Sequence, residues 1–180
     1  MTPMPSPARR FPLPPLPRRA LLVLAALPLL LLPLVLLASR QSTGPQLLPA
    51  AITVAAVLLV TLALKRRRVV LDGRQLQVAA TLYTRRIDVD ALDLERARVV
   101  DLAERTELSP QLKLNGYSLP GFKAGHFRLR NRAYGFCLLI GDGRALVLPQ
   151  RDGKYLLLSV SQPQVLLDEL RRVAGPAPGR

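Results

Sequence analysis

The sequence predicts a two-helix transmembrane hairpin followed by a mainly β domain of about seven antiparallel strands, capped by a C-terminal α-helix. Three observations predict this fold class. Two long apolar stretches lie near the N-terminus, alternating apolar and polar residues with Asp-Gly turns follow them, and an amphipathic pattern ends the chain. With 180 residues, the chain has room for one ordinary domain and a smaller element.

Charge and apolarity are separated along the chain. Hydrophobic residues make up 49% of the sequence, yet the formal net charge is +14. Arg40 is the single charged residue between positions 20 and 64, and every acidic residue follows Lys65. A basic balance fits nucleic acid or an anionic surface. Few aromatic residues accompany the basic ones, which argues against nucleic acid.

Residues 20–38 and 47–64 have the length and apolarity of membrane spans. At about 1.5 Å per residue, each helix would extend roughly 27–29 Å, close to the ~30 Å hydrocarbon core of a bilayer. A signal peptide followed by one anchor is the alternative, but its apolar region usually has about 7–15 residues. Neither stretch contains an ionisable side chain, so we expect the helices to anchor the chain or pack together.

Basic flanks predict the orientation of this hairpin. Arginines precede the first span, a basic run follows the second, and Arg40 lies between them. The positive-inside rule then predicts a multi-pass protein of a bacterial inner membrane with both termini cytoplasmic. The predicted units are a Pro- and Arg-rich disordered cytoplasmic tail (1–19), transmembrane helices (20–38 and 47–64), an external loop (39–46), a basic juxtamembrane tether (65–68), the β domain (69–174) and a disordered tail (175–180).

The β domain is predicted from period-two patterns joined by turns. Asp72-Gly73 and Asp152-Gly153 indicate hairpins, and Gly141-Asp142-Gly143 is expected to join two neighbouring strands. Ser161 is the expected N-cap of the last helix, with Gln164 completing a capping box. The expected strands lie at 69–71, 76–80, 82–87, 97–102, 126–130, 134–140, 145–148 and 155–160.

The expected domain has about seven strands closed by a C-terminal helix. Together with that arrangement, the segments N-G-Y-S-L-P-G-F-K-A-G-H-F-R-L (115–129), D-G-K-Y-L-L-L-S (152–159) and Q-P (162–163) resemble a bacterial family of pleckstrin-homology domains. Its members commonly carry N-terminal membrane helices, and their biochemical role is not established. The resemblance covers residues 69–173. It implies an aromatic residue, such as Trp, at the position that His126 occupies here.

Two groups of basic residues are candidate contacts for anionic lipid headgroups or a partner. The tether supplies Lys65, Arg66, Arg67 and Arg68, although a topology signal alone would explain it. A predicted strand face supplies Lys123, His126, Arg128 and Arg130, in a stretch without acidic residues. An acidic peptide is a further possible ligand there, and an ordinary solvated face is the alternative.

A Gly- and Pro-rich loop is a candidate docking site for a partner protein, with a purely structural loop as the alternative. No Gly-Lys-Ser/Thr sequence and no helix follow it, so it is not a phosphate-binding loop. Its residues are Asn115, Gly116, Tyr117, Pro120, Gly121 and Phe122.

No catalytic motif is recognisable. Cys137 lies among apolar residues and is expected to be buried, and the single histidine excludes a His-pair metal motif. The carboxylates between Asp88 and Glu95 fall in a polar segment without calcium-loop spacing. The sequence therefore predicts a non-catalytic, membrane-anchored interaction or scaffold module without cofactor, metal or nucleic acid. An anionic-lipid-sensing domain is the alternative, and the protein partner is unknown.

Overall fold

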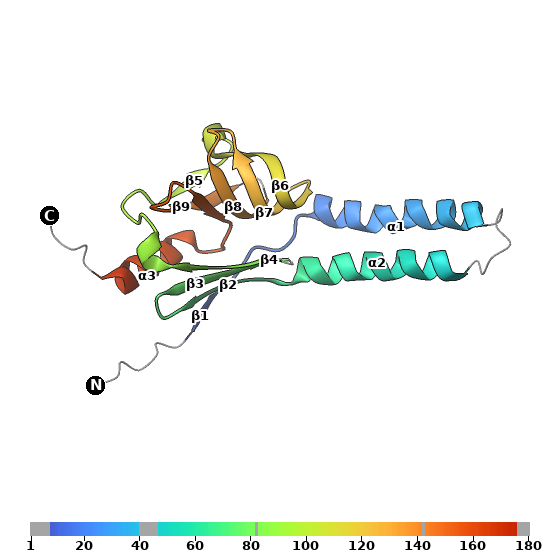
Figure 1. The fold of residues 1–180 in the computed structure, drawn as a ribbon, viewed down its shortest axis with the longest axis horizontal. Helices are drawn as coiled ribbons and strands as arrows, with labels where there is room; N and C mark the ends of the chain where they lie inside the picture. The colour runs from blue at the N-terminus through green and yellow to red at the C-terminus, as the bar shows by residue number, and fades with distance from the viewer. Residues whose placement is uncertain (1–7, 40–46, 82, 142, 176–180) are drawn as a thin grey trace.

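The computed structural model describes residues 8–39, 47–81, 83–141 and 143–175. Within these residues the chain forms ten strands in two sheets and three α-helices. The two longest helices, α1 (Arg18–Ser39) and α2 (Leu47–Lys65), project together from one side of the β domain, and the shorter α3 (Pro163–Ala174) lies at its other end (Figure 1). Single 3-10 turns occur at Val89–Ala91 and Thr106–Leu108.

The smaller sheet is antiparallel, with the order β1-β2-β3-β4. Asp72 pairs with Gln75 across the β2–β3 turn, and Gly73 has φ +55°, so the Asp-Gly hairpin predicted here is confirmed. The strands are β1 (Arg9–Phe11), β2 (Arg67–Asp72), β3 (Gln75–Ala80) and β4 (Tyr83–Asp88).

The larger sheet has the order β5-β9-β10-β8-β7-β6. Strand β10 lies between β8 and β9, parallel to β8 and antiparallel to β9. The strands are β5 (Arg98–Asp101), β6 (Pro110–Leu119), β7 (Phe122–Leu129), β8 (Tyr134–Ile140), β9 (Arg144–Pro149) and β10 (Tyr155–Leu158).

This strand order corrects the predicted fold class. The seven-stranded, all-antiparallel arrangement is contradicted by two sheets that include a parallel pair. Strands β8 and β9 are not neighbours, so the turn at Gly141 and Gly143 does not close a hairpin between them. The physical reason is the burial of Leu156, Leu157 and Leu158 in β10. A strand that is apolar on both faces belongs inside a sheet that is covered on both sides.

The two sheets enclose the main core together with α3 (Pro163–Ala174), which buries Leu166, Leu167 and Leu170. A second core lies on the other face of the larger sheet. The C-terminal helix is therefore confirmed, and Gly175 ends it with φ +77°. Its predicted cap is wrong, because Gln162 holds the N-cap position without a side-chain hydrogen bond.

Helices form at both predicted spans, as α1 (Arg18–Ser39) and α2 (Leu47–Lys65), and they lie side by side (Figure 1). A membrane span needs about 20 consecutive, mainly apolar residues. Among the residues that the structure describes, no helix meets this requirement of length and apolarity. The predicted transmembrane hairpin is therefore contradicted, together with the integral, multi-pass inner-membrane location. The predicted external loop lies, apart from Ser39, outside the described residues.

The N-terminal segment also differs from the prediction. Residues 9–11, expected to be disordered, form β1 and pair with β2. The side chain of Phe11 belongs to the main core and is only 6% exposed. The β domain thus includes a strand that precedes the two long helices.

Candidate functional site

Strand β6 forms one edge of the larger sheet, and among the described strands it pairs only with β7. The five residues from Gln111 to Asn115 are all exposed. Two of them are apolar, since Leu112 is 55% and Leu114 48% exposed. No described strand pairs with the outer side of β6, so its outward N–H and C=O groups are free to bond another chain.

Two irregularities shape this edge. The pairing with β7 shifts between Pro110 and Leu112 and again between Lys113 and Asn115, which leaves Gln111 and Leu114 without opposite residues. Such bulges bend a strand and redirect its side chains. Here the second bulge places Leu114 at the wall of a cleft that also contains His126.

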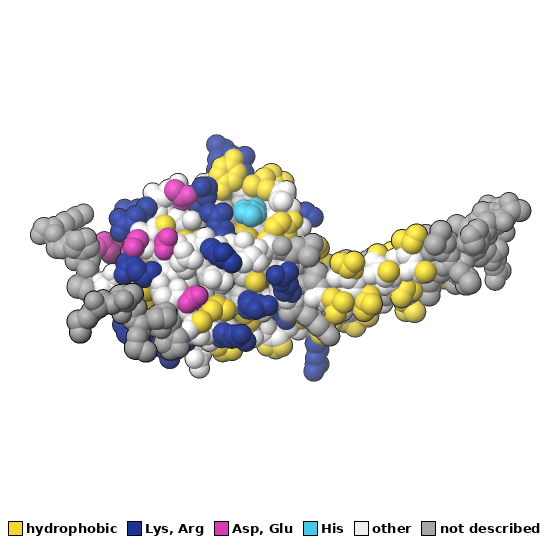
Figure 2. Space-filling model, turned by 60° about the horizontal axis from the view of Figure 1, so that its bottom comes forward, with side chains coloured by type: hydrophobic (Ala, Val, Ile, Leu, Met, Phe, Trp, Pro, Cys, Tyr) yellow, Lys and Arg dark blue, Asp and Glu magenta, His cyan; other side chains and the backbone are white. Residues whose placement is uncertain are grey.

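The cleft beside β6 has an apolar wall and a basic rim. Its volume is about 140 Å³, and Leu114, Tyr134 and His126 are among its lining residues. The basic lining residues are Arg85 from β4 and Lys154 from the segment before β10, and Lys154 forms an ion pair with Asp152 at 2.6 Å. In Figure 2 the single histidine lies beside hydrophobic and Lys or Arg side chains on the upper part of the β domain. Sites for small molecules usually measure about 300–1,000 Å³, so this cleft fits one side chain better.

His126 packs as an aromatic residue. Its ring lies edge-on to Phe136, with 5.0 Å between centroids, and to Tyr83, with 6.1 Å. Burial, and to a lesser extent the charge of Arg85, lowers the pKa of His126 below its usual 6.5. The imidazole is therefore neutral at pH 7. Tyr83 also donates a hydrogen bond from its hydroxyl to Asn115 Oδ1, which links β4 to β6.

The predicted basic strand face is only partly assembled. Lys123 lies on the opposite face of β7 from His126, and its Nζ donates a hydrogen bond to the carbonyl of Pro110 at 3.1 Å. Arg128 lies on the side of His126, with its guanidinium carbon 6.0 Å from the centroid of Tyr134. Arg130 follows the end of β7 and is exposed.

The predicted docking loop is a hairpin. Asn115, Gly116 and Tyr117 belong to β6, the turn contains Pro120 and Gly121, and Phe122 begins β7 as a fully buried residue. Gly116 pairs with Gly125, where the strands approach closely. A Cβ atom on Gly116 would lie 2.2 Å from the carbonyl oxygen of Ala124. These glycines therefore position β6 rather than a mobile binding loop.

The predicted basic tether lies where α2 meets the smaller sheet. Lys65 ends α2, Arg66 and Arg68 are exposed, and Arg67 begins β2. The guanidinium carbon of Arg67 is 5.9 Å from the ring centroid of Phe122. Its Nε and Nη1 atoms are buried and have no hydrogen-bond partner among the described residues. Burial lowers the pKa of Arg67.

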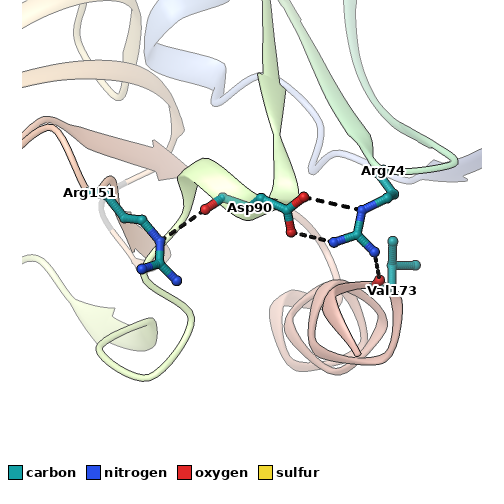
Figure 3. Close-up of polar contacts among 4 residues, drawn as sticks. All are labelled: Arg74, Asp90, Arg151 and Val173. Atoms are coloured by element: carbon teal, nitrogen blue, oxygen red, sulfur yellow. Dashed lines mark hydrogen bonds and ion pairs between the residues drawn. The ribbon is translucent and has the colours of Figure 1, made fainter. Parts of the chain in front are cut away.

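The remaining reactive side chains have structural roles. Cys137 is fully buried, and burial raises its pKa to about 12, so its thiol stays protonated. Asp90 pairs with Arg74, which also donates a hydrogen bond to the carbonyl of Val173 at 2.8 Å (Figure 3). Arg151 Nε donates to the backbone carbonyl of Asp90 at 3.0 Å. This cluster connects the β2–β3 turn to the end of α3. Among the described residues, no three His, Cys, Asp or Glu side chains gather as a metal site.

Sequence reasoning missed most of the cleft. Arg85, Leu114 and Lys154 come from three distant segments, so no local pattern connects them. The one available signal was the run P-Q-L-K-L, in which Leu112 and Leu114 alternate with polar residues. Both leucines are exposed in the structure. No protein-family model, curated protein or solved structure matches this chain. The resemblance to the pleckstrin-homology family therefore stays a prediction.

Proposed function

We propose that this chain is a non-catalytic interaction module that binds an extended, acidic segment of a partner protein along β6. The observation that carries the proposal is the free edge of β6, where Leu112 and Leu114 are exposed beside the cleft. In strand addition, main-chain hydrogen bonds supply affinity and pockets for alternate side chains supply specificity. Both the free strand edge and a side-chain pocket are present here, and Leu114 belongs to both.

Charge favours an acidic partner segment. Arg85 lines the cleft, and Arg128 lies on the same side of β7. Lys154 also lines the cleft, but its ammonium group forms an ion pair with Asp152. The sequence contains no Asp or Glu between Glu107 and Asp142, so β6 and β7 carry only positive charges. Complementary charge would speed the association of an acidic segment with this surface. It would also fix the register in which the segment pairs with β6.

The size of the cleft favours a peptide over a metabolite. At about 140 Å³ it accommodates one apolar side chain of the added strand, next to Leu114 and Tyr134. Side chains of a strand alternate between the two faces of a sheet, so the residues two positions before and after it would point to the same face and meet Arg85 beside the cleft. The recognised pattern is thus an apolar residue with acidic residues two positions away on either side.

The proposal that this module is non-catalytic is supported by the positions of its reactive side chains. The Cys137 thiol is buried and protonated, His126 is held between aromatic rings, and Asp90 pairs with Arg74. None of these groups reaches a second group that would activate it. Lipid sensing by the predicted basic face is not favoured, because Lys123 lies across the sheet from His126.

The test is a selection from a display library of ten-residue peptides with the full-length chain as bait. We expect selected peptides with an apolar residue among acidic ones. Leu114→Asp should weaken their binding at least tenfold, because it adds negative charge to the cleft wall. Val165→Asp is the matched control, since Val165 is an exposed apolar residue of α3 at 42% exposure. Equal binding by the two variants, or selected peptides without acidic residues, would overturn the proposal.

A further inference from the structure

A separate basic pocket lies beside β1 and β2. It is a wide, open depression with a volume of about 470 Å³. In Figure 2, Lys and Arg side chains gather on the part of the β domain next to the two long helices. The pocket is lined by Arg10, Phe11, Pro12, Leu13, Arg67, Arg68 and Val69.

The strand register explains how three arginines come to line this pocket. Strand β1 ends at Phe11, which pairs with Val69, so Arg67 and Arg68 have no partner in β1. Arg10 pairs with Val70, and Arg68 lies two positions from Val70 on β2, so Arg10 and Arg68 share the outer face. Arg67 points inward, against the ring of Phe122.

The positive charge of this pocket is not compensated by any residue that the structure describes. None of Arg10, Arg67 and Arg68 forms an ion pair or a side-chain hydrogen bond with a described residue. Two nitrogens of Arg67 are moreover buried without a partner. Buried polar groups nearly always have partners in folded proteins, and a missing ion is one explanation where they do not.

We propose that this pocket binds a phosphate group carried by an organic molecule. Guanidinium groups present a planar fork of donors that matches phosphate oxygens, and they keep their charge at every physiological pH. Phe11 and Leu13 give the pocket an apolar wall for the organic part. This site is on the smaller sheet, apart from β6, and it does not depend on the peptide function proposed above.

The test is calorimetric titration of the full-length chain with glycerol 3-phosphate and with inorganic phosphate at constant ionic strength. Arg10→Gln and Arg68→Gln should each weaken phosphate binding about tenfold. Both side chains are exposed, so the variants should keep their fold, which thermal unfolding checks. Arg130→Gln is the matched control, since Arg130 is exposed and lies outside the pocket.

Vesicles of phosphatidic acid, compared with phosphatidylcholine, identify the source of the phosphate. Binding of glycerol 3-phosphate assigns a soluble ligand, whereas binding of phosphatidic acid vesicles alone assigns a lipid headgroup. Either result supports the proposal if Arg10→Gln and Arg68→Gln weaken the binding of that probe. The proposal is overturned if no probe binds, or if both variants bind as well as Arg130→Gln.

Discussion

His126 shows how one side chain can change its chemistry in the fold. Packing against Phe136 and Tyr83 makes it an uncharged aromatic residue, although its sequence neighbours suggested a basic contact. An aromatic residue at position 126 was expected only from the resemblance to the pleckstrin-homology family. The sequence could not show which rings surround it, because Tyr83 comes from the other sheet.

The lowered pKa of His126 predicts a pH-dependent stability. In the unfolded chain this pKa is about 6.5, and in the folded protein it is lower, chiefly through burial. The unfolded state therefore binds a proton first as the pH falls, so stability is complete above about pH 6.5 and decreases below it. His126→Phe should remove this decrease. Urea unfolding at pH 7.5 and 5.5 measures the decrease in the free energy of unfolding. An equal decrease in the natural chain and in His126→Phe would contradict the assignment of this pH dependence to His126.

Among the elements, β1 shows how distant segments hold the β domain together. Arg9 forms a 3.0 Å ion pair with Glu169 of α3, and the amide of Ser161 donates to the carbonyl of Pro12 at 2.9 Å. Phe11 adds a buried ring to the core. The segment before α1 thus binds to the last helix of the chain through these contacts.

This attachment predicts a large effect from a short segment. Phe11→Ala should lower the free energy of unfolding by about 3 kcal/mol, because it removes a buried aromatic ring and leaves a cavity. Pro12→Ala, at an exposed position that keeps its carbonyl, should have an effect within about 0.5 kcal/mol. Urea unfolding of the two variants measures both. A Phe11→Ala protein as stable as the natural chain would show that β1 is dispensable.

Local signals predicted the elements that depend on local interactions. The β2–β3 hairpin followed from Asp72-Gly73, and α3 followed from its amphipathic pattern. The place of β10 between β8 and β9 did not follow, because pairing between strands depends on contacts far apart in the sequence. The apolar run 156–158 was a usable signal for a central strand. Helices at the two apolar stretches were predicted, whereas their crossing of a membrane is contradicted.

At the scale of the whole molecule, the two proposed sites are built from different strands. The cleft combines Arg85 of β4 with Leu114 of β6 and with Lys154, which precedes β10. The phosphate pocket combines β1 with β2, which the helices α1 and α2 separate in the sequence. Sequence reasoning found Arg67 and Arg68 as a basic run, but Arg10 joins them only through the fold. Both sites therefore depend on how the sheets are assembled.

Hydrogen exchange of the β6 amides tests the central claim most directly. The full-length chain would be measured alone and with a peptide selected from the display library. Strand addition predicts slower exchange for those amides between Pro110 and Leu119 that do not bond to β7. Amides of α3 should not change. Slower exchange confined to other strands, with β6 unaffected while the peptide is bound, would contradict the account.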